Sequence, residues 1–382
     1  MGNGRFLGAS TTLEGMLSVF VGGYKRGEIF WRVVFLGGVV GGSYWLSETA
    51  AGGVDFAKGA FERLPSTYTE QRAALAGGLV GLGASLAGGS TLTHGLSGLS
   101  VGGVRGGLAT AVMIAAGAAA ASSTGAAAAL GVDEKKGTAL TSPAMPRSVQ
   151  EWTWLGTIIV VPALFVFASL RGAAHAATAL ERAKKTAFFL KHGPKRTESL
   201  IRRGWKVNEL FGEFFAGALT MFALGATGVT HPSKVVAFLS FASPAWDPTV
   251  GLAMATAAAV AAPLGLWALG PRWLATRPAF REAFALPSKT DVDPFLILGA
   301  ALFGAGWGTG GLSPVTAIAN VSQCAENPQM LTFLQYMVAG IMLRLLGAKL
   351  ASRAAGLIRG KAPLASTGRI SSAAAPGLRE RR

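Results

Sequence analysis

Eight apolar runs, nearly free of charged residues, constrain the fold of this 382-residue chain more than any other feature. A helix of about 20 apolar residues spans a bilayer. Charged residues make up 14% of the chain, whereas a soluble domain carries roughly 25%. Too few charges remain to cover a surface that faces water, so the sequence predicts an all-α polytopic membrane protein with about eight spans or half-spans. The runs are Ile29 to Leu46, Ala73 to Gly89, Gly106 to Ala121, Trp152 to Leu170, Phe211 to Gly228, Val250 to Leu269, Pro294 to Phe303 and Leu331 to Leu346.

The net charge of +16 raises the question whether the chain binds nucleic acid. The charge is gathered, however, in Arg171 to Lys206, with ten Lys or Arg against two Glu, and in the tail from Lys349 to Arg382. Basic segments beside membrane spans stay on the untranslocated side and bind anionic headgroups. We therefore expect lipid or partner subunits there, and no nucleic acid. Four runs precede the first basic segment and four separate the two, which predicts both termini on one side.

The runs and basic segments divide the chain into four parts. Residues 1–170 form a first half, 171–206 a basic connecting segment, 207–348 a second half and 349–382 a basic tail. The single cysteine, Cys324, excludes an intrachain disulfide. The chain has no Walker A sequence, no HExxH and no zinc-type Cys/His cluster. The sequence therefore favours neither an enzyme nor a metal or cofactor site.

Two aspartates precede prolines at the edges of apolar runs. Asp247 and Asp293 each stand where an N-cap acid comes before a first-turn proline. The alternative role, a proton or cation site within the membrane, is less favoured because both lie at run edges. Arg32 lies inside the first run and either reaches the interface or pairs with a carboxylate.

Glycines four residues apart predict close helix packing, because small residues at that spacing let backbones touch in lipid. A denser pattern occurs twice, 223 residues apart, as glycine, any residue, glycine, four residues, glycine, one residue, serine. We expect glycine this dense to end helices and to produce re-entrant segments at membrane depth. The four-apart pairs include Gly38 with Gly42, Gly77 with Gly81, and Gly304 with Gly308; the two copies of the motif are Gly81, Gly83, Gly88, Ser90 and Gly304, Gly306, Gly311, Ser313.

A matched pair of glycine-broken segments in two halves of a chain indicates a transporter's binding site. Broken backbone at that depth is tolerated where it lines a cavity, and its free N–H groups suit an anion. The serine that ends each motif adds a hydroxyl. Gly306, Gly308 and Gly311 also fit GxGxxG, but a dinucleotide site needs a preceding strand in a soluble βαβ unit.

Three stretches of the chain resemble the YeeE/YedE family of sulfur-compound transport proteins. The first, ALAGGLVGLGASLAGGSTLTHGLSGL, covers Ala74 to Leu99; the others cover Gly225 to Val250 and Asp291 to Pro314. The resemblance implies an all-helical membrane fold of two related halves with an internal repeat. It also implies uptake of thiosulfate or a related sulfur anion.

The chain departs from the family pattern at both signature cysteines. Serine replaces them, in Ser90-Thr91-Leu92-Thr93-His94 and in Ser313-Pro314-Val315. A hydroxyl binds an oxyanion but does no thiolate or persulfide chemistry. The resemblance therefore implies a sulfur-oxyanion path along these residues, although His94 fits a satisfied packing residue equally well. The predicted path consists of Ser90, Thr91, Thr93, His94, Ser313 and Pro314.

Two functions follow from these patterns. The first is transport of a sulfur oxyanion through a central site between the halves. The second is a structural accessory subunit of a larger membrane complex, for example in the mitochondrial inner membrane, which has kept the fold after losing transport. The missing cysteines and the two basic segments favour the second; the retained glycine architecture and His94 favour the first.

Overall fold

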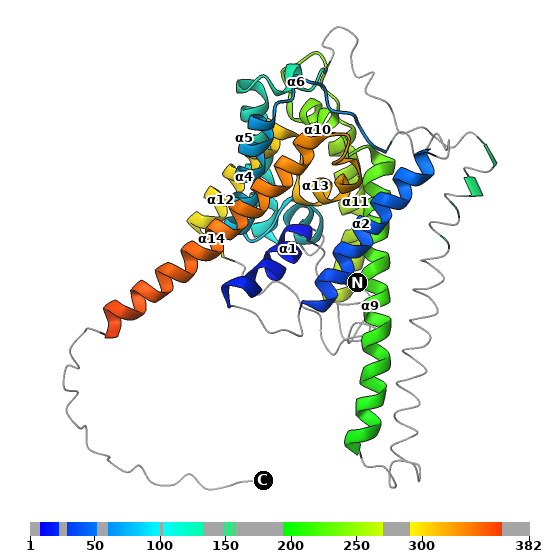
Figure 1. Ribbon diagram of the computed structural model, residues 1–382, viewed down its shortest axis with the longest axis vertical. Helices are drawn as coiled ribbons and strands as arrows, with labels where there is room; N and C mark the ends of the chain where they lie inside the picture. Colours follow the sequence, from blue (N-terminus) through cyan, green and yellow to red (C-terminus); the bar gives the residue numbers. More distant parts are fainter. Residues whose placement is uncertain are drawn as a thin grey trace, which may run out of the picture.

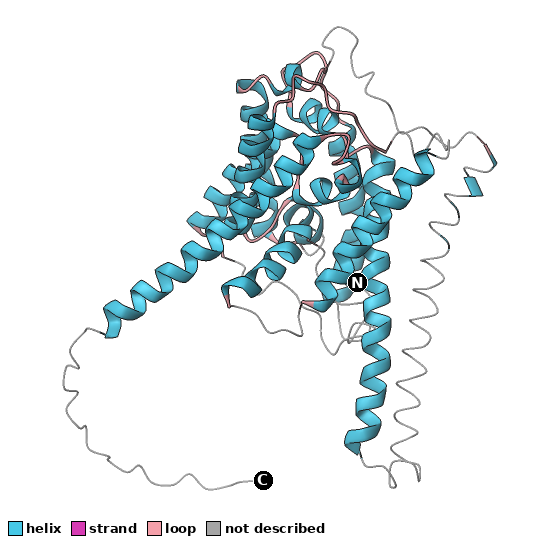
Figure 2. Ribbon diagram, viewed as in Figure 1, coloured by secondary structure: helices cyan, strands magenta, loops and turns pink. Residues whose placement is uncertain are grey.

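The computed structural model describes residues 8–22, 29–51, 60–99, 102–132, 194–269 and 291–360, with isolated positions between 148 and 160. Every regular element in these residues is a helix, which confirms the predicted all-α class there (Figure 2). Most of the expected run Trp152 to Leu170, residues 171–193 of the basic segment and the tail beyond residue 360 lie outside this part. The helices are α1 (Ala9–Leu17), η1 (Ser18–Val21), α2 (Phe30–Ala51), α4 (Glu70–Ala87), η3 (Leu92–Gly98), α5 (Val104–Ser123), α6 (Ala126–Ala129), α9 (Pro194–Thr227), α10 (Pro232–Leu239), α11 (Thr249–Leu269), α12 (Pro294–Gly310), α13 (Pro314–Ala319), η4 (Val321–Gln323) and α14 (Pro328–Gly360).

Four helices, α4, α5, α12 and α14, form the centre of the molecule (Figure 1). α4 packs against both α12 and α14, and α12 packs in turn against α5. Glycines make these contacts close: a Cβ atom at Gly81 would collide with the carbonyl oxygen of Met337, and one at Gly304 with that of Met113. Small residues at such crossings allow backbones to touch.

α2 and the apolar part of α9 form a second close pair beside this centre (Figure 1). A Cβ atom at Gly38 would collide with the carbonyl oxygen of Phe214, and one at Gly217 with that of Phe35. Gly42 faces the Met221 side chain, whose Cβ would lie 3.1 Å from the added atom. α9 begins at Pro194, so the last part of the basic segment is helical rather than a simple connection.

Three helices are long and apolar enough to cross a membrane: α5, the Glu209–Thr227 part of α9 and the Pro328–Ala355 part of α14. α4 and η3 pass the same test together as a pair bent by 43°, as a broken span or re-entrant segment would be. α12 is apolar but shorter, with 17 residues. The described residues therefore give three or four candidate spans, and the predicted eight are not confirmed. The chain is a helical integral membrane protein.

The glycine motifs do not break their helices where the spacing suggested. α4 continues through Gly81 and Gly83 to Ala87, and α12 continues through Gly304 and Gly306 to Gly310. These glycines serve helix packing instead. The third glycine of each motif is the one that ends the helix, since Gly88 and Gly311 adopt φ of 72° and 70°. Such a left-handed residue after the last turn stops a helix, and glycine adopts it without a Cβ penalty.

Arg32 does not extend away from the protein. Its Nη1 donates to the Thr11 carbonyl oxygen at 2.7 Å, and its guanidinium lies 4.5 Å from the centroid of the Trp31 ring. A Cβ atom at Gly15 would collide with the guanidinium, so the contact needs glycine there. Arg32 therefore fixes α1 against the start of α2.

Candidate functional site

A cavity of about 200 Å³ lies between the segment that follows the first glycine motif, from Thr91 on, and the end of the second motif at Ser313. Its wall is largely apolar, with side chains such as Leu96, Met254 and Trp307. Five hydroxyl groups interrupt this wall. They belong to Thr91 before η3, Thr220 and Thr227 of α9, and Ser313 and Thr316 at the start of α13.

The hydroxyls differ in what they can still bond. Thr220 and Thr227 donate to the carbonyl oxygens of Ala216 and Ala223, at 2.7 Å each, so they present acceptor lone pairs to the cavity. Thr91 has no hydrogen bond to its side chain within the described part of the chain. Thr91 is therefore able to donate into the cavity.

Ser313, at the end of the second motif, also caps a helix. Its Oγ accepts from the Thr316 N–H at 3.5 Å, and the Thr316 Oγ1 accepts from the Ser313 N–H at 2.7 Å. This reciprocal pair is a capping box, and Pro314 follows at the first helical position. The two hydroxyl oxygens lie 3.2 Å apart. Because Ser313 only accepts from the backbone, its proton remains available to Thr316 or to a solute.

Ser90, at the end of the first motif, does not line the cavity. It is 0% exposed, and its Oγ has no hydrogen-bond partner among the residues that the structure describes. The Oγ1 of Thr93 is likewise buried and unpartnered there. Buried polar atoms are nearly always hydrogen-bonded in native proteins, so two unpartnered hydroxyl oxygens one turn apart require an explanation.

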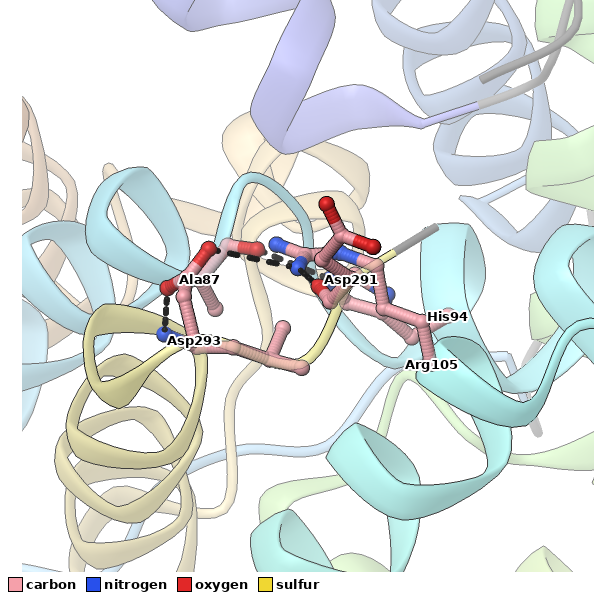
Figure 3. Close-up of polar contacts among 6 residues, drawn as sticks. Ala87, His94, Arg105, Asp291 and Asp293 are labelled. Atoms are coloured by element: carbon pink, nitrogen blue, oxygen red, sulfur yellow. Dashed lines mark hydrogen bonds and ion pairs between the residues drawn. The ribbon is translucent and has the colours of Figure 1, made fainter. Parts of the chain in front are cut away.

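His94 lies beside the end of α4, away from the cavity lining (Figure 3). Its Nε2 lies 3.2 Å from the Ala87 carbonyl oxygen, and the residue is 7% exposed. That carbonyl belongs to the last turn of α4 and would otherwise lack a partner. This geometry fits a packing residue that satisfies a helix end.

Arg105, which the sequence analysis did not single out, holds the start of α12 (Figure 3). It contacts the Asp291 carbonyl oxygen and lies 3.4 Å from the Asp293 carboxylate. Asp293 also accepts from the Leu296 N–H at 2.8 Å, as an N-cap does. Asp247 likewise accepts from the Thr249 N–H at 2.9 Å where α11 begins. Both aspartates thus have backbone donors at helix starts.

Within the described part of the chain, no three His, Cys, Asp or Glu side chains gather closely enough to hold a metal ion. Of the predicted path residues, Thr91 and Ser313 line one cavity, whereas Ser90, Thr93, His94 and Pro314 do not line it. Sequence reasoning missed Thr220, Thr227 and Thr316. The helical spacing of Thr220 and Thr227, seven residues apart on one apolar helix face, is the signal that would have found the first two.

Two proteins of the bacterium Xylella fastidiosa are similar to this chain, and both carry the name "Probable transporter". The protein of strain Temecula1 is 39% identical over 128 residues, which cover 34% of this chain and 82% of the relative. The protein of strain 9a5c is 40% identical over 128 residues, which cover 34% and 84%. The chain belongs to the family of these transporter-like proteins.

The model of a family of unknown function, DUF6691, matches residues 209–355. This range contains the apolar part of α9, α10 to α13, and most of α14. No solved structure matches the chain significantly. The transporter names of the relatives and the apolar helices together indicate a membrane transporter.

Proposed function

We propose that the protein moves a small sulfur oxyanion, such as thiosulfate, through the cavity between its two glycine motifs. One observation carries the proposal: Thr91 beside the first motif and Ser313 of the second present hydroxyl groups to the same cavity. In an apolar wall, little water competes with an anion for the hydroxyl donors, so they bind the anion strongly. The resemblance to the YeeE/YedE family supplies the substrate class.

The proposal includes an internal repeat that relates the two halves, residues 1–170 and 207–348. The packing between the halves is matched and supports this repeat. α4 of the first half packs against α14 of the second, and α12 of the second packs against α5 of the first. In the same way, α2 of the first half contacts α13, and α11 of the second contacts η3. In each half a helix ends at a left-handed glycine and is followed by a short helix. Such repeats place a substrate site where the broken segments meet.

Ser90 and Thr93 extend the proposed path beyond the cavity. Their buried, unpartnered oxygens have hydrogen-bonding capacity that the described protein groups leave unused. An oxyanion that moves past the first motif would use that capacity. We assign His94 no direct contact with the solute, since its ring nitrogen faces the Ala87 carbonyl.

Uptake of labelled thiosulfate and sulfate into proteoliposomes tests the proposal. Ala253→Phe should abolish uptake, because Ala253 lines the cavity and phenylalanine would fill it. Ala255→Phe is the matched control, since Ala255 is exposed on the same helix and does not line the cavity. Equal uptake by the two variants would refute the cavity as the path.

Hydroxyl variants sharpen the assignment. Thr91→Val keeps the side-chain shape and should lower uptake, whereas Thr256→Val removes an exposed hydroxyl on α11 that bonds to Leu252 and should not. The double variant Ser90→Cys, Ser313→Cys restores the thiols of the resembled family. Faster uptake by this variant is expected if the serines occupy the family's relay positions.

A further inference from the structure

The short helix α10 carries a lysine into the interior of the protein. All eight residues of α10 are buried, and Lys234 is only 1% exposed. An isolated ammonium is very costly to bury, so a buried lysine requires nearby negative charge. Lysines of this kind inside membrane proteins mark sites of function by default.

Two carboxylates supply the negative charge, from separate parts of the chain. Glu62 precedes α4 and Asp247 precedes α11, and backbone hydrogen bonds hold both beside α10, where their charges favour the Lys234 ammonium; the Asp247 N–H donates to the Ala237 carbonyl oxygen at 3.4 Å. Glu62 is anchored to α10, because its Oε2 accepts from the Ser233 N–H at 3.1 Å. Asp247 is 5% exposed and accepts from both the N–H and the hydroxyl of Thr249.

Two other titratable side chains lie next to this charge cluster along the described chain. Arg63 follows Glu62 and is exposed, and His231 is buried at the start of α10. Among their described residues, the helices packed against α10 (α5, α6, α11 and α12) contribute one charged side chain, Arg105, and Arg105 pairs with Asp293. Because Arg63 is exposed and its charge is screened by solvent, the balance of Lys234, Glu62 and Asp247 sets the charge behind the cavity wall.

The cluster lies directly behind the cavity wall. A Cβ atom at Gly228, which has φ of 66°, would lie 2.8 Å from the Lys234 Nζ. The residues on either side of Gly228, Thr227 and Val229, both line the cavity. One residue of backbone therefore separates the ammonium from the space in which the solute would reside. At this range, a change of one unit charge in a medium of low dielectric constant changes the binding of an anion strongly.

We propose that Glu62, Lys234 and Asp247 form a proton-binding site that couples the entry of an anion into the cavity to the uptake of one proton. This inference rests on the proposed transport function. With all three groups ionised, the cluster carries one net negative charge and repels an anion. A proton taken from water by the Glu62 carboxylate leaves Lys234 balanced by Asp247 alone, so the net charge is zero. The proton returns to water when the anion leaves.

Glu62, rather than Asp247, is the group that takes the proton. It is half-buried, so water reaches it, whereas Asp247 is closed off. Asp247 also accepts two hydrogen bonds, from the N–H and the hydroxyl of Thr249. Burial raises the pKa of Glu62 above that of an ordinary glutamate, although the hydrogen bond from the Ser233 N–H and the charge of Lys234 oppose the change.

Proteoliposome uptake of labelled thiosulfate, with the outside pH made more acidic than the inside, tests the coupling. The wild type should take up the anion severalfold faster under this gradient than at equal pH. Glu62→Gln keeps a side-chain oxygen for the Ser233 N–H but binds no proton, so its uptake should not respond to the gradient. Glu14→Gln is the matched control, because Glu14 is also a partly buried carboxylate, 3.2 Å from Arg344, but does not line the cavity. A gradient response in Glu62→Gln equal to that of the wild type would overturn the inference.

A second readout separates this inference from the proposed function. Infrared difference spectra of the purified protein, recorded against pH without any anion, should show a carboxyl band that titrates above the ordinary glutamate range. Burial raises the pKa of Glu14 too, so Glu62→Gln should lose one carboxyl's share of this band, and Glu14→Gln should keep that share. Identical spectra for the wild type and Glu62→Gln would overturn the proton site. Absence of wild-type uptake at every pH, with the band present, would instead refute the transport function and with it the coupling.

Discussion

The two glycine motifs share one spacing, but the structure uses their last residues differently. After α12, Ser313 caps α13 and lines the cavity. After α4, Ser90 is buried with an unpartnered oxygen, and Thr91 takes the place beside the cavity. The segment that follows is a short α-helix in one case and the π-helix η3 in the other. π-Helices often occur at functional sites, so an equal spacing of glycines fixes where helices stop but not what the next residues do.

The largest expected effects concern the glycines that the two motifs use in the same way. Gly81→Leu and Gly304→Leu should each cost about 3 kcal/mol or more, because the added side chain would meet the backbone of α14 or α5. Gly78→Leu, on α4 but with no atom within 4 Å of an added Cβ, is the control and should be tolerated. Thermal unfolding in detergent measures the difference; equal loss in Gly78→Leu would contradict the packing role.

A smaller effect should separate the two helix-ending glycines. Alanine in the left-handed conformation costs roughly 1–2 kcal/mol, and Gly88→Ala should cost no more because nothing lies within 4 Å of its Cβ position. Gly311→Ala should cost more, since its Cβ would also collide with the Pro232 carbonyl oxygen. Unfolding of the two variants side by side checks the order. The reverse order would mean that α10 moves away from Gly311 easily.

The two roles of the glycines show which features of the fold the sequence alone could predict. The apolar runs correctly predicted the helical class in the described residues, and Asp293, predicted as an N-cap from the proline that follows it, lies at the start of α12. Which glycines of a motif pack and which one ends a helix depends on the partner helix, as with Gly81 against Met337. No local pattern contains that information. For the same reason the spacing could not reveal the cavity role of Thr220 or the cluster around Lys234, since both depend on contacts between distant segments.

The next effect distinguishes the two serines. Ser313→Ala removes an N-cap and should cost about 1 kcal/mol. Ser90→Ala removes a buried hydroxyl without a described partner and should leave stability unchanged or slightly higher, because the unpaired group is lost. Unfolding midpoints in detergent test this difference. A clear destabilisation by Ser90→Ala would show that its hydroxyl has a partner in the folded protein.

The smallest expected effect concerns the acid that starts the second motif's helix. Asp293→Asn keeps an N-cap oxygen for the Leu296 N–H but removes the charge beside Arg105, so it should cost about 0.5 kcal/mol in low salt. The loss should shrink as salt screens the pair, whose side chains are 14% and 22% exposed. Asp293→Ala, which removes the cap as well, should cost about 1 kcal/mol more. Unfolding at two salt concentrations separates the two contributions.

The first motif's helix, α4, has an uncharged N-cap instead. Its cap Thr69 accepts from the Arg72 N–H through the side-chain oxygen, so Thr69→Ala should lower stability by an amount that does not depend on salt. A salt-dependent loss in Thr69→Ala, or a salt-independent one in Asp293→Asn, would remove this distinction between the two helix starts.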